Sequence, residues 1–418
     1  MSNQKLSTES YKGVRDFYPQ DQFIQEYLFE TMRTTCERFG YESYHASILE
    51  PAELYRSKTS EEIVNDQTYT FTDRGGREVT LRPEMTPTVT RMVAGKRREL
   101  VFPLRWYTIA NMFRYERPQR GRVREHWQLN ADIFGAPGVE ADAEIIALAH
   151  QLMLDMGASP QAFEIRVNDR RLLNEIFTKT ELDDSQKSFV MRLLDRRDKI
   201  DDFSAQLVGH IGADRAAIVE KELARANSSA YLEELLSLLY TLGIENVHID
   251  TSIVRGFDYY TGMIFEVFDT SPENTRSLFG GGRYDNLFGL FDDEQMSAVG
   301  FGMGDVTARD FLDTHGLLPS YTPATELMLC VLEPGHMAHA MKLAHDLRTE
   351  DVTVAVNFSG KRAGDQIKHA LKMGISSIIC IGSHERETGQ YTLKHLPSAK
   401  ETVLAADRIA SHLLSAQG

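Results

Sequence analysis

Cysteine is scarce in this 418-residue chain, and its three cysteines lie far apart. Cys36, Cys330 and Cys380 form no Cys-x-x-Cys pair, so neither a disulfide framework nor a cysteine-based zinc site is indicated. The thirteen histidines are not spaced like a metal cluster either. We therefore predict no metal site, and the cysteine pattern favours the reducing cytoplasm.

Long apolar runs and an excess of positive charge are also missing. No run of 18 apolar residues occurs, and Met1 to Tyr11 lacks the apolar core of a signal peptide, so no membrane partner is expected. The net charge of −15 argues against nonspecific coating of DNA or RNA, because neutralising phosphates requires a basic surface. A nucleic acid that docks on local basic patches stays possible, and no DNA partner is expected.

The composition is that of an ordinary globular protein, with 42% apolar and 26% charged residues. A chain of this length exceeds one compact core, so two or three domains are expected. Helical periodicity covers residues 22–39 and 139–156, and a β-hairpin is predicted at 69–84 around Gly75-Gly76. Strand-like runs at 105–116 and 126–135 then predict an antiparallel sheet as the core of this part.

Leucine-rich helical periodicity dominates from about residue 172 to 243, and strand-like composition resumes at Val247. We therefore expect a sheet domain formed by residues 1–171 and 244–318, interrupted by a helical insertion at 172–243. A linker is placed at 319–325. Strands and helices alternate through 326–418, which predicts a small α/β domain with a partly parallel sheet.

The stretch from Arg255 to Asp285 concentrates polar groups: Arg255-Gly-Phe-Asp-Tyr-Tyr260, Phe265-Glu266 and Gly280-Gly-Gly-Arg-Tyr-Asp285. A guanidinium, phenols, carboxylates and a glycine run on adjacent strands suit a pocket that holds a small zwitterion against a phosphate. The alternative is a polar hairpin with a glycine-rich turn.

A basic loop is the second signal. Phe113-Arg114-Tyr115-Glu116 ends a predicted strand, and Arg120, Arg122 and Arg124 fill the turn that follows. Arg114 at a strand end would hold its fork toward an anion, since guanidinium binds phosphate or carboxylate bidentately. The loop arginines are mobile cations suited to a polyphosphate or a nucleic-acid end, although a solvated hairpin with surface charge is the alternative.

Taken in order, five motifs resemble those of the histidyl-tRNA synthetases, which are class II aminoacyl-tRNA synthetases. They are Lys12-Gly-Val-Arg-Asp-Phe-Tyr-Pro19, Leu81-Arg-Pro-Glu84, Phe113-Arg-Tyr-Glu-Arg-Pro-Gln119, Arg255-Gly-Phe-Asp-Tyr-Tyr260 and Gly280-Gly-Gly-Arg-Tyr-Asp285. The likeness covers nearly the whole chain. It implies an α+β catalytic domain on a mainly antiparallel sheet with a helical insertion, plus a small α/β, anticodon-binding-like C-terminal domain.

The resemblance also implies an activity and partners. The histidine carboxylate would attack the α-phosphorus of ATP, and the resulting adenylate would pass histidine to the terminal ribose of tRNA. Mg²⁺ is expected on the outer phosphates, and the family implies a homodimer. Such catalysis consists of aligning oxygens and neutralising developing charge.

Site residues carry over by their match to the family motifs. Glu84 and Gln128, with Thr86 beside them, match the positions that bind the α-ammonium, and Asp132 matches the acid that faces the imidazole. Arg114 matches the arginine on the α-phosphate and carboxylate, and Arg255 matches a cation on the other side of that phosphate; these two are the expected catalytic residues. The remaining expected contacts are Tyr259, Tyr260 and Tyr284 around the imidazole, with Arg114, Glu116, Arg122 and Arg255 on ATP.

Two departures from the family pattern stand out. A proline usual in the first class motif aligns with Ser47, and the chain has Pro51 instead. The family usually places Glu-Arg, whose arginine meets adenine and the γ-phosphate, where this chain has Val306-Thr307. Arg309 lies two residues later, which on a helix is a turn of about 200°. Either the helix register shifts, or another cation such as Arg122 covers the γ-phosphate.

Two other functions fit parts of the pattern. A non-catalytic, histidine-sensing regulatory paralogue of histidine biosynthesis resembles these enzymes, and the altered segment at 305–309 favours it. Arg114, Arg255, the basic loop and the C-terminal domain oppose it. A ligase for proline, threonine or glycine is the third, since Leu81-Arg-Pro-Glu-Met-Thr-Pro87 has that character, but the tyrosine-rich segment disfavours it.

Overall fold

The computed structural model describes residues 6–56, 67–117, 119, 121–194, 197, 200–225, 229–253, 259–274, 276–292 and 294–415. The chain folds into two compact units, Met1–Pro319 and Ser320–Gly418, and each is described by itself. Within the described ranges, no helix has both the length and the apolar character needed to cross a membrane.

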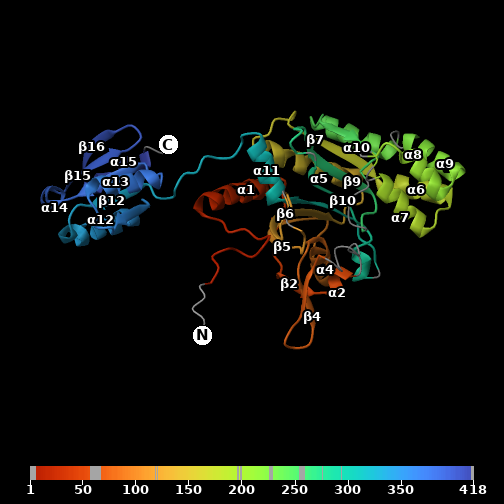
Figure 1. The fold of residues 1–418 in the computed structure, drawn as a ribbon, viewed down its shortest axis with the longest axis horizontal. Coiled ribbons are helices and arrows are strands. Elements are labelled where there is room, and N and C mark those ends of the chain that lie inside the picture. Colours follow the sequence, from red (N-terminus) through yellow and green to blue (C-terminus); the bar gives the residue numbers. More distant parts are fainter. Residues whose placement is uncertain are drawn as a thin grey trace. The chain divides into compact units, whose positions relative to one another are not determined.

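An eight-stranded sheet forms the centre of the first unit (Figure 1). The two outer pairs, β1 with β5 and β7 with β8, are parallel, and the five pairings between them are antiparallel. The mainly antiparallel sheet predicted for this region is confirmed. In spatial order the strands are β1 (Glu42–Ser43), β5 (Leu104–Phe113), β6 (Glu125–Phe134), β11 (Ala298–Gly304), β10 (Ser277–Arg283), β9 (Met263–Asp269), β7 (Phe163–Asp169) and β8 (Val247–Ile249).

Helices cover one face of this sheet, because alternate strand residues on that face are apolar. On β6 these are Leu129, Ala131 and Ile133, which join the main core. The intervening residues of β6 point to the opposite face, since side chains alternate along a strand. The covering helices are α1 (Pro19–Arg38), α5 (Val139–Asp155), α10 (Ala230–Thr241) and α11 (Asp305–Thr314).

A small three-stranded sheet, in the order β2-β4-β3, lies apart from the eight-stranded one in hydrogen bonding. The hairpin predicted at 69–84 is confirmed as β3 (Tyr69–Thr72) and β4 (Glu78–Leu81). Asp73 closes its turn by accepting from the amides of Gly75 and Arg77. The other elements here are β2 (Leu49–Pro51), α2 (Glu53–Arg56) and α4 (Thr86–Lys96). Pro51 lies on the edge strand β2, where its missing amide proton breaks no ladder.

Among the described residues, four helices between β7 and α10 share a core of their own. They are α6 (Arg170–Thr180), α7 (Asp184–Leu194), α8 (Phe203–Ile211) and α9 (Ala213–Arg225), and they bury Leu173, Val190, Leu207 and Val219 together. The fifth helix of this leucine-rich region, α10, differs. It packs on α5, and its buried leucines join the main core.

The second unit is an α/β domain with the strand order β13-β12-β14-β15-β16. Its first three strands are parallel and the last two are antiparallel, so the partly parallel sheet is confirmed. The closing hairpin and last helix were not anticipated. The strands are β12 (Leu327–Val331), β13 (Val354–Asn357), β14 (Ser377–Ile381), β15 (Gln390–His395) and β16 (Lys400–Ala405), and the helices are α12 (Met337–Thr349), α13 (Ala363–Lys372), α14 (Ser383–Thr388) and α15 (Ala406–Ser415).

Candidate active site

Two buried tyrosine–carboxylate pairs lie on the sheet face opposite the main core. Tyr284 donates its hydroxyl to Oδ1 of Asp132 at 2.6 Å, and Tyr259 donates to Oε2 of Glu84 at 3.0 Å. The ring of Tyr259 lies 5.0 Å from that of Tyr260 and 5.9 Å from that of Tyr284. Five of the predicted histidine-binding residues are thus brought together from four separate segments of the chain.

Asp132 is the electrostatically unusual member of this group. Burial raises the pKa of its carboxyl to about 7, and the hydrogen bond from Tyr284 offsets part of that rise. Among the described residues, neither Oδ2 of Asp132 nor the hydroxyl of Tyr44, both buried, has a hydrogen-bond partner. A buried polar atom without a partner is costly, so this pocket is suited to a polar ligand that supplies one.

Glycines on β11 leave room for the side chains of β6. Gly300 pairs with Asp132 and Gly302 with Asn130 in the antiparallel register. A Cβ atom at Gly300 would lie 2.1 Å from Oδ1 of Asp132, and one at Gly302 would lie 2.3 Å from Nε2 of Gln128. Glycine at alternate positions of Gly300-Phe-Gly-Met-Gly304 therefore leaves space for the side chains of Asp132 and Gln128 at the base of the pocket. Sequence reasoning missed this signal.

The glycine run 280–282 lies inside strand β10, so the alternative of a glycine-rich turn is wrong. A Cβ atom at Gly281 would lie 2.1 Å from the carbonyl oxygen of Gly300, and one at Gly280 or Gly282 would meet a carbonyl of β9 at 2.4 or 2.5 Å. Close approach of three backbones explains this run. Arg283, directly after it, is buried and pairs with Asp142 at 2.6 Å.

The remaining predicted histidine-binding residues lie beside these pairs. Gln128 lies four residues before Asp132 on β6, on the same face, and donates Nε2 to Asn130 at 2.7 Å. Thr86 is the first residue of α4 and is buried. Arg82, which sequence reasoning missed, is fully buried; it donates to the carbonyls of Asn111 and Ala46 at 2.9 and 2.8 Å. Arg82 thereby braces the segment that carries Glu84.

Arg114 directly follows β5, on the strand face that carries the pocket. Its Nε donates to the carbonyl oxygen of Pro83 at 2.9 Å, which fixes the plane of the guanidinium next to the Glu84 segment. Burial, followed by the charges of Arg114 and Arg15, lowers the pKa of His126 to about 3. The two arginines thus place positive charge at this end of the strands, where an anion is favoured.

The loop arginines behave differently from one another. Arg122 lies 3.6 Å from Glu116 and is half exposed, whereas Arg124 stacks 4.1 Å from the ring centre of Tyr115 and donates to the hydroxyl of Tyr11. Arg124 is therefore fixed, and its interpretation as a mobile cation is wrong. Arg120 and Arg255 lie outside the described residues.

A cavity of about 350 Å³ opens where the β5–β6 loop, the start of β10 and α11 meet. Arg122, Arg276, Leu278 and Thr307 are among the residues that line it. Thr307 donates to the carbonyl oxygen of Leu278 at 2.6 Å, which fixes the first turn of α11 against β10. Arg309 instead donates to Asp21 of α1 at 2.8 Å, so a register shift that would bring it to the place of Thr307 does not occur.

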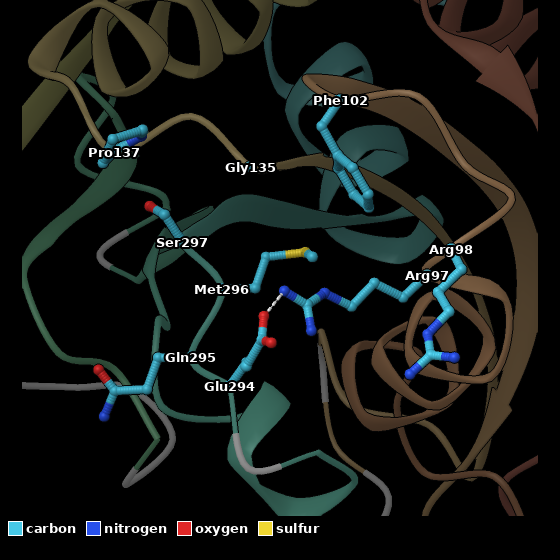
Figure 2. A pocket seen from close by; sticks show the side chains of 9 residues that line it. All are labelled: Arg97, Arg98, Phe102, Gly135, Pro137, Glu294, Gln295, Met296 and Ser297. Atoms are coloured by element: carbon cyan, nitrogen blue, oxygen red, sulfur yellow. Dashed lines mark hydrogen bonds and ion pairs between the residues drawn. The ribbon is translucent and has the colours of Figure 1, made fainter.

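A second, more open cavity of about 640 Å³ contains none of the predicted site residues (Figure 2). Arg97, Met296 and Phe102 point toward its middle, and Arg97 pairs with Glu294. Because no predicted site residue lines this cavity, whereas Arg122 and Thr307 line the other one, the candidate anion site is placed beside Thr307.

Comparisons with known proteins agree with this arrangement. The family model described as histidyl-tRNA synthetase matches residues 13–305, and the one described as an anticodon binding domain matches 326–415. Curated histidine–tRNA ligases of Leptospira biflexa and Thermoplasma volcanium are 43% and 34% identical to the chain, each covering 96% of both sequences.

Solved structures agree on the fold. A histidyl-tRNA synthetase from Nostoc sp. matches with a TM-score of 0.80 at 22% identity, over 98% of this chain and 100% of that one. A Bacillus halodurans protein titled ATP phosphoribosyltransferase regulatory subunit/histidyl-tRNA synthetase matches with a TM-score of 0.73 over 91% of this chain and all of its own. At such identities the likeness concerns the fold alone. The sequence matches reach further: the chain belongs to the histidyl-tRNA synthetase family, with a class II catalytic unit and a C-terminal anticodon-binding domain.

Proposed function

We propose that the chain ligates histidine to tRNA through a histidyl-adenylate formed from ATP. The observation that carries this proposal is the buried Asp132–Tyr284 pair, whose second carboxylate oxygen has no partner in the part of the chain that the structure describes. A neutral imidazole N–H can donate to that oxygen. An apolar side chain of similar size would leave it unpaired, and sites of this kind reject such analogues strongly.

The other predicted site residues would bind the remaining parts of histidine and the α-phosphate of ATP. Glu84, held by Tyr259, would bind the α-ammonium together with Gln128 and Thr86, since a carboxylate and two neutral oxygens suit a cation. Tyr260 and Tyr284 would enclose the imidazole. Arg114 would hold the histidine carboxylate against the α-phosphate, and Arg255 would neutralise the charge that develops there, which makes this pair the proposed catalytic residues.

ATP would extend from Arg114 toward the cavity beside Thr307, with Arg122 at its outer phosphates and Glu116, 3.6 Å from Arg122, orienting that guanidinium. Mg²⁺ bound with ATP commonly uses one or two protein carboxylates together with the phosphates. Glu273 and Asp310 line that cavity and fit such a donor set. When bound, Mg²⁺ would neutralise charge on the leaving pyrophosphate.

Further assignments rest on the family. We propose a homodimer, a cytoplasmic location, and a tRNA substrate whose anticodon is read by residues 326–418. We also propose residues 1–171 and 244–318 as the catalytic domain, 172–243 as the insertion and 319–325 as the linker. The separate core of α6 to α9 supports an insertion, whereas α10 packs into the main core and does not share it. The regulatory alternative is disfavoured, because relatives that match over 96% of the chain are curated as ligases.

Exchange of pyrophosphate into ATP, measured with each amino acid in turn, tests this proposal. We expect exchange with histidine alone, and we expect Arg255→Ala to lower the rate of adenylate formation far more than histidine affinity. Histidine binding without any exchange would support the regulatory alternative. Equal losses of rate and affinity in Arg255→Ala would refute the role given to that arginine.

A further inference from the structure

Arg276 lines the cavity beside Thr307 and has no role in the proposed function. It directly precedes β10, in the connection from β9, and its side chain is exposed. Among the described residues, no carboxylate lies within ion-pair distance of its guanidinium. Of the other arginines near this cavity, Arg309 pairs with Asp21 at 2.8 Å, whereas Arg122 is half exposed and lies 3.6 Å from Glu116, so it keeps donors for an anion.

The segment that carries Arg276 is anchored on both sides. Before it, Asn274 donates to Asp269 at 2.6 Å and to Thr314 of α11 at 3.1 Å. After it, the carbonyl oxygen of Leu278 accepts the hydroxyl of Thr307 at 2.6 Å. The backbone at Arg276 is thus tied to both ends of α11, so the guanidinium is presented to the cavity from a fixed base. A cation on a fixed base loses less entropy when it binds an anion.

The position of the cavity along the sheet indicates which part of the substrate reaches it. From Asp132 to Gln128 the strand β6 runs four residues, or about 13 Å, toward the basic loop. Gln128 pairs with Gly304, whose carbonyl oxygen also accepts the hydroxyl of Thr307 at 3.2 Å. Histidine bound between Asp132 and Gln128 therefore directs its carboxylate end toward Arg114 and, beyond it, toward this cavity.

We propose that Arg276 binds the outer phosphates of ATP and the pyrophosphate that leaves, opposite Arg122. The inference rests on the proposed function and assigns it a further positioning cation. In an in-line displacement the leaving group lies away from the attacking carboxylate, so its charge must be neutralised beyond Arg114. Two guanidinium forks from different segments suit a diphosphate, since each binds two oxygens.

Histidine-dependent exchange with Arg276→Ala tests this inference, because pyrophosphate is itself a substrate of that assay. Loss of one charge-assisted contact predicts KM values for ATP and for pyrophosphate raised by roughly 10- to 100-fold, with the histidine KM within about twofold of the parent value. Inhibition by AMP, which lacks the outer phosphates, should not change. Arg276→Lys should recover part of the loss, since it restores the charge without the fork.

Arg74→Ala is the matched control, because Arg74 is exposed at the β3–β4 turn and lines no part of the cavity. Unchanged KM values for ATP and pyrophosphate in Arg276→Ala would overturn the inference. An equal weakening of AMP would overturn it too, because the contact would then lie on the nucleoside side. Calorimetric titration with Mg·ATP and with pyrophosphate compares the affinities of the parent and of Arg276→Ala without turnover. It therefore tests the role of Arg276 separately from the proposed function, which a parent protein without exchange activity would refute.

Discussion

Replacing Asp132 by asparagine is predicted to stabilise the unliganded protein while weakening its hold on histidine. The carboxyl has a pKa of about 7 in the folded protein, raised by burial from 3.8, and Tyr44, Tyr260 and Tyr284 are the titratable groups that face it. As pH rises from about 4 to about 7, the unfolded chain loses this proton first. Folding stability therefore falls across that window and is lower by about 4 kcal/mol above it.

An asparagine side chain carries no charge and escapes this cost. At pH 8, urea unfolding of Asp132→Asn without ligand should give a higher free energy of unfolding than the parent, with about 4 kcal/mol as the upper limit. The difference should narrow as the pH is lowered toward 4, where the parent carboxyl is protonated in both states. A variant that is less stable than its parent at pH 8 would refute the burial argument.

The same substitution should impair histidine binding in a pH-dependent way. Loss of a charge-assisted bond predicts Kd weaker by roughly 10- to 100-fold at pH 8. The parent loses affinity as Asp132 protonates below pH 7, so the ratio of variant Kd to parent Kd should fall about tenfold from pH 8 to pH 6. The titration of free histidine cancels in this ratio. Calorimetric titration at the two pH values measures it, and a constant ratio would show that Asp132 does not accept the imidazole proton.

Three other substitutions test neighbouring contacts. Tyr284→Phe removes the donor that lowers the pKa of Asp132, so the pH at which histidine affinity drops should move upward in the same titration; an unmoved midpoint would contradict the pairing. Gly300→Ala should weaken histidine binding at least tenfold, because its Cβ would collide with Oδ1 of Asp132, whereas Gly209→Ala, with nothing within 4 Å on helix α8, should leave binding unchanged. Arg283→Ala should lower the free energy of unfolding by about 3–5 kcal/mol, since it leaves the carboxylate of Asp142 buried without its cation; a loss below 1 kcal/mol would argue against that pair.

Periodicity and turn chemistry predicted most of the elements that position the site. The hairpin around Gly75-Gly76 and the strands that flank the basic loop were foreseen, because both depend on local sequence. From sequence alone, the run Gly280–Gly282 was also compatible with a glycine-rich turn. Its cause lies in two neighbouring strands more than ten residues away in the chain, which no local pattern reveals.

Arg82 illustrates a different limit. Arginine is almost never fully buried, so the sequence did not indicate a buried role for Arg82. Glu84 was therefore the one residue of Leu81-Arg-Pro-Glu84 to which a function was assigned. The guanidinium of Arg82 is buried because backbone carbonyls from two other segments satisfy it. Such satisfaction is a property of the assembled fold. By contrast, the alternate glycines at 300, 302 and 304 were readable, since period-two glycine in a strand marks one face kept clear.

Two buried carboxylates on the same unit show how structure separates stability from function. Asp142 faces Arg283 at 2.6 Å and also accepts from Tyr231, and burial raises its pKa only to about 6 because that cation offsets part of the penalty. Within the described ranges, Asp132 accepts from the phenol of Tyr284 alone, and its pKa reaches about 7. The charge of Asp142 is already stabilised by a cation of the protein, so a ligand would add no further stabilisation there. The site of Asp132 leaves Oδ2 unsatisfied and the carboxylate destabilised, and an imidazole N–H that pairs with it recovers that free energy as binding specificity.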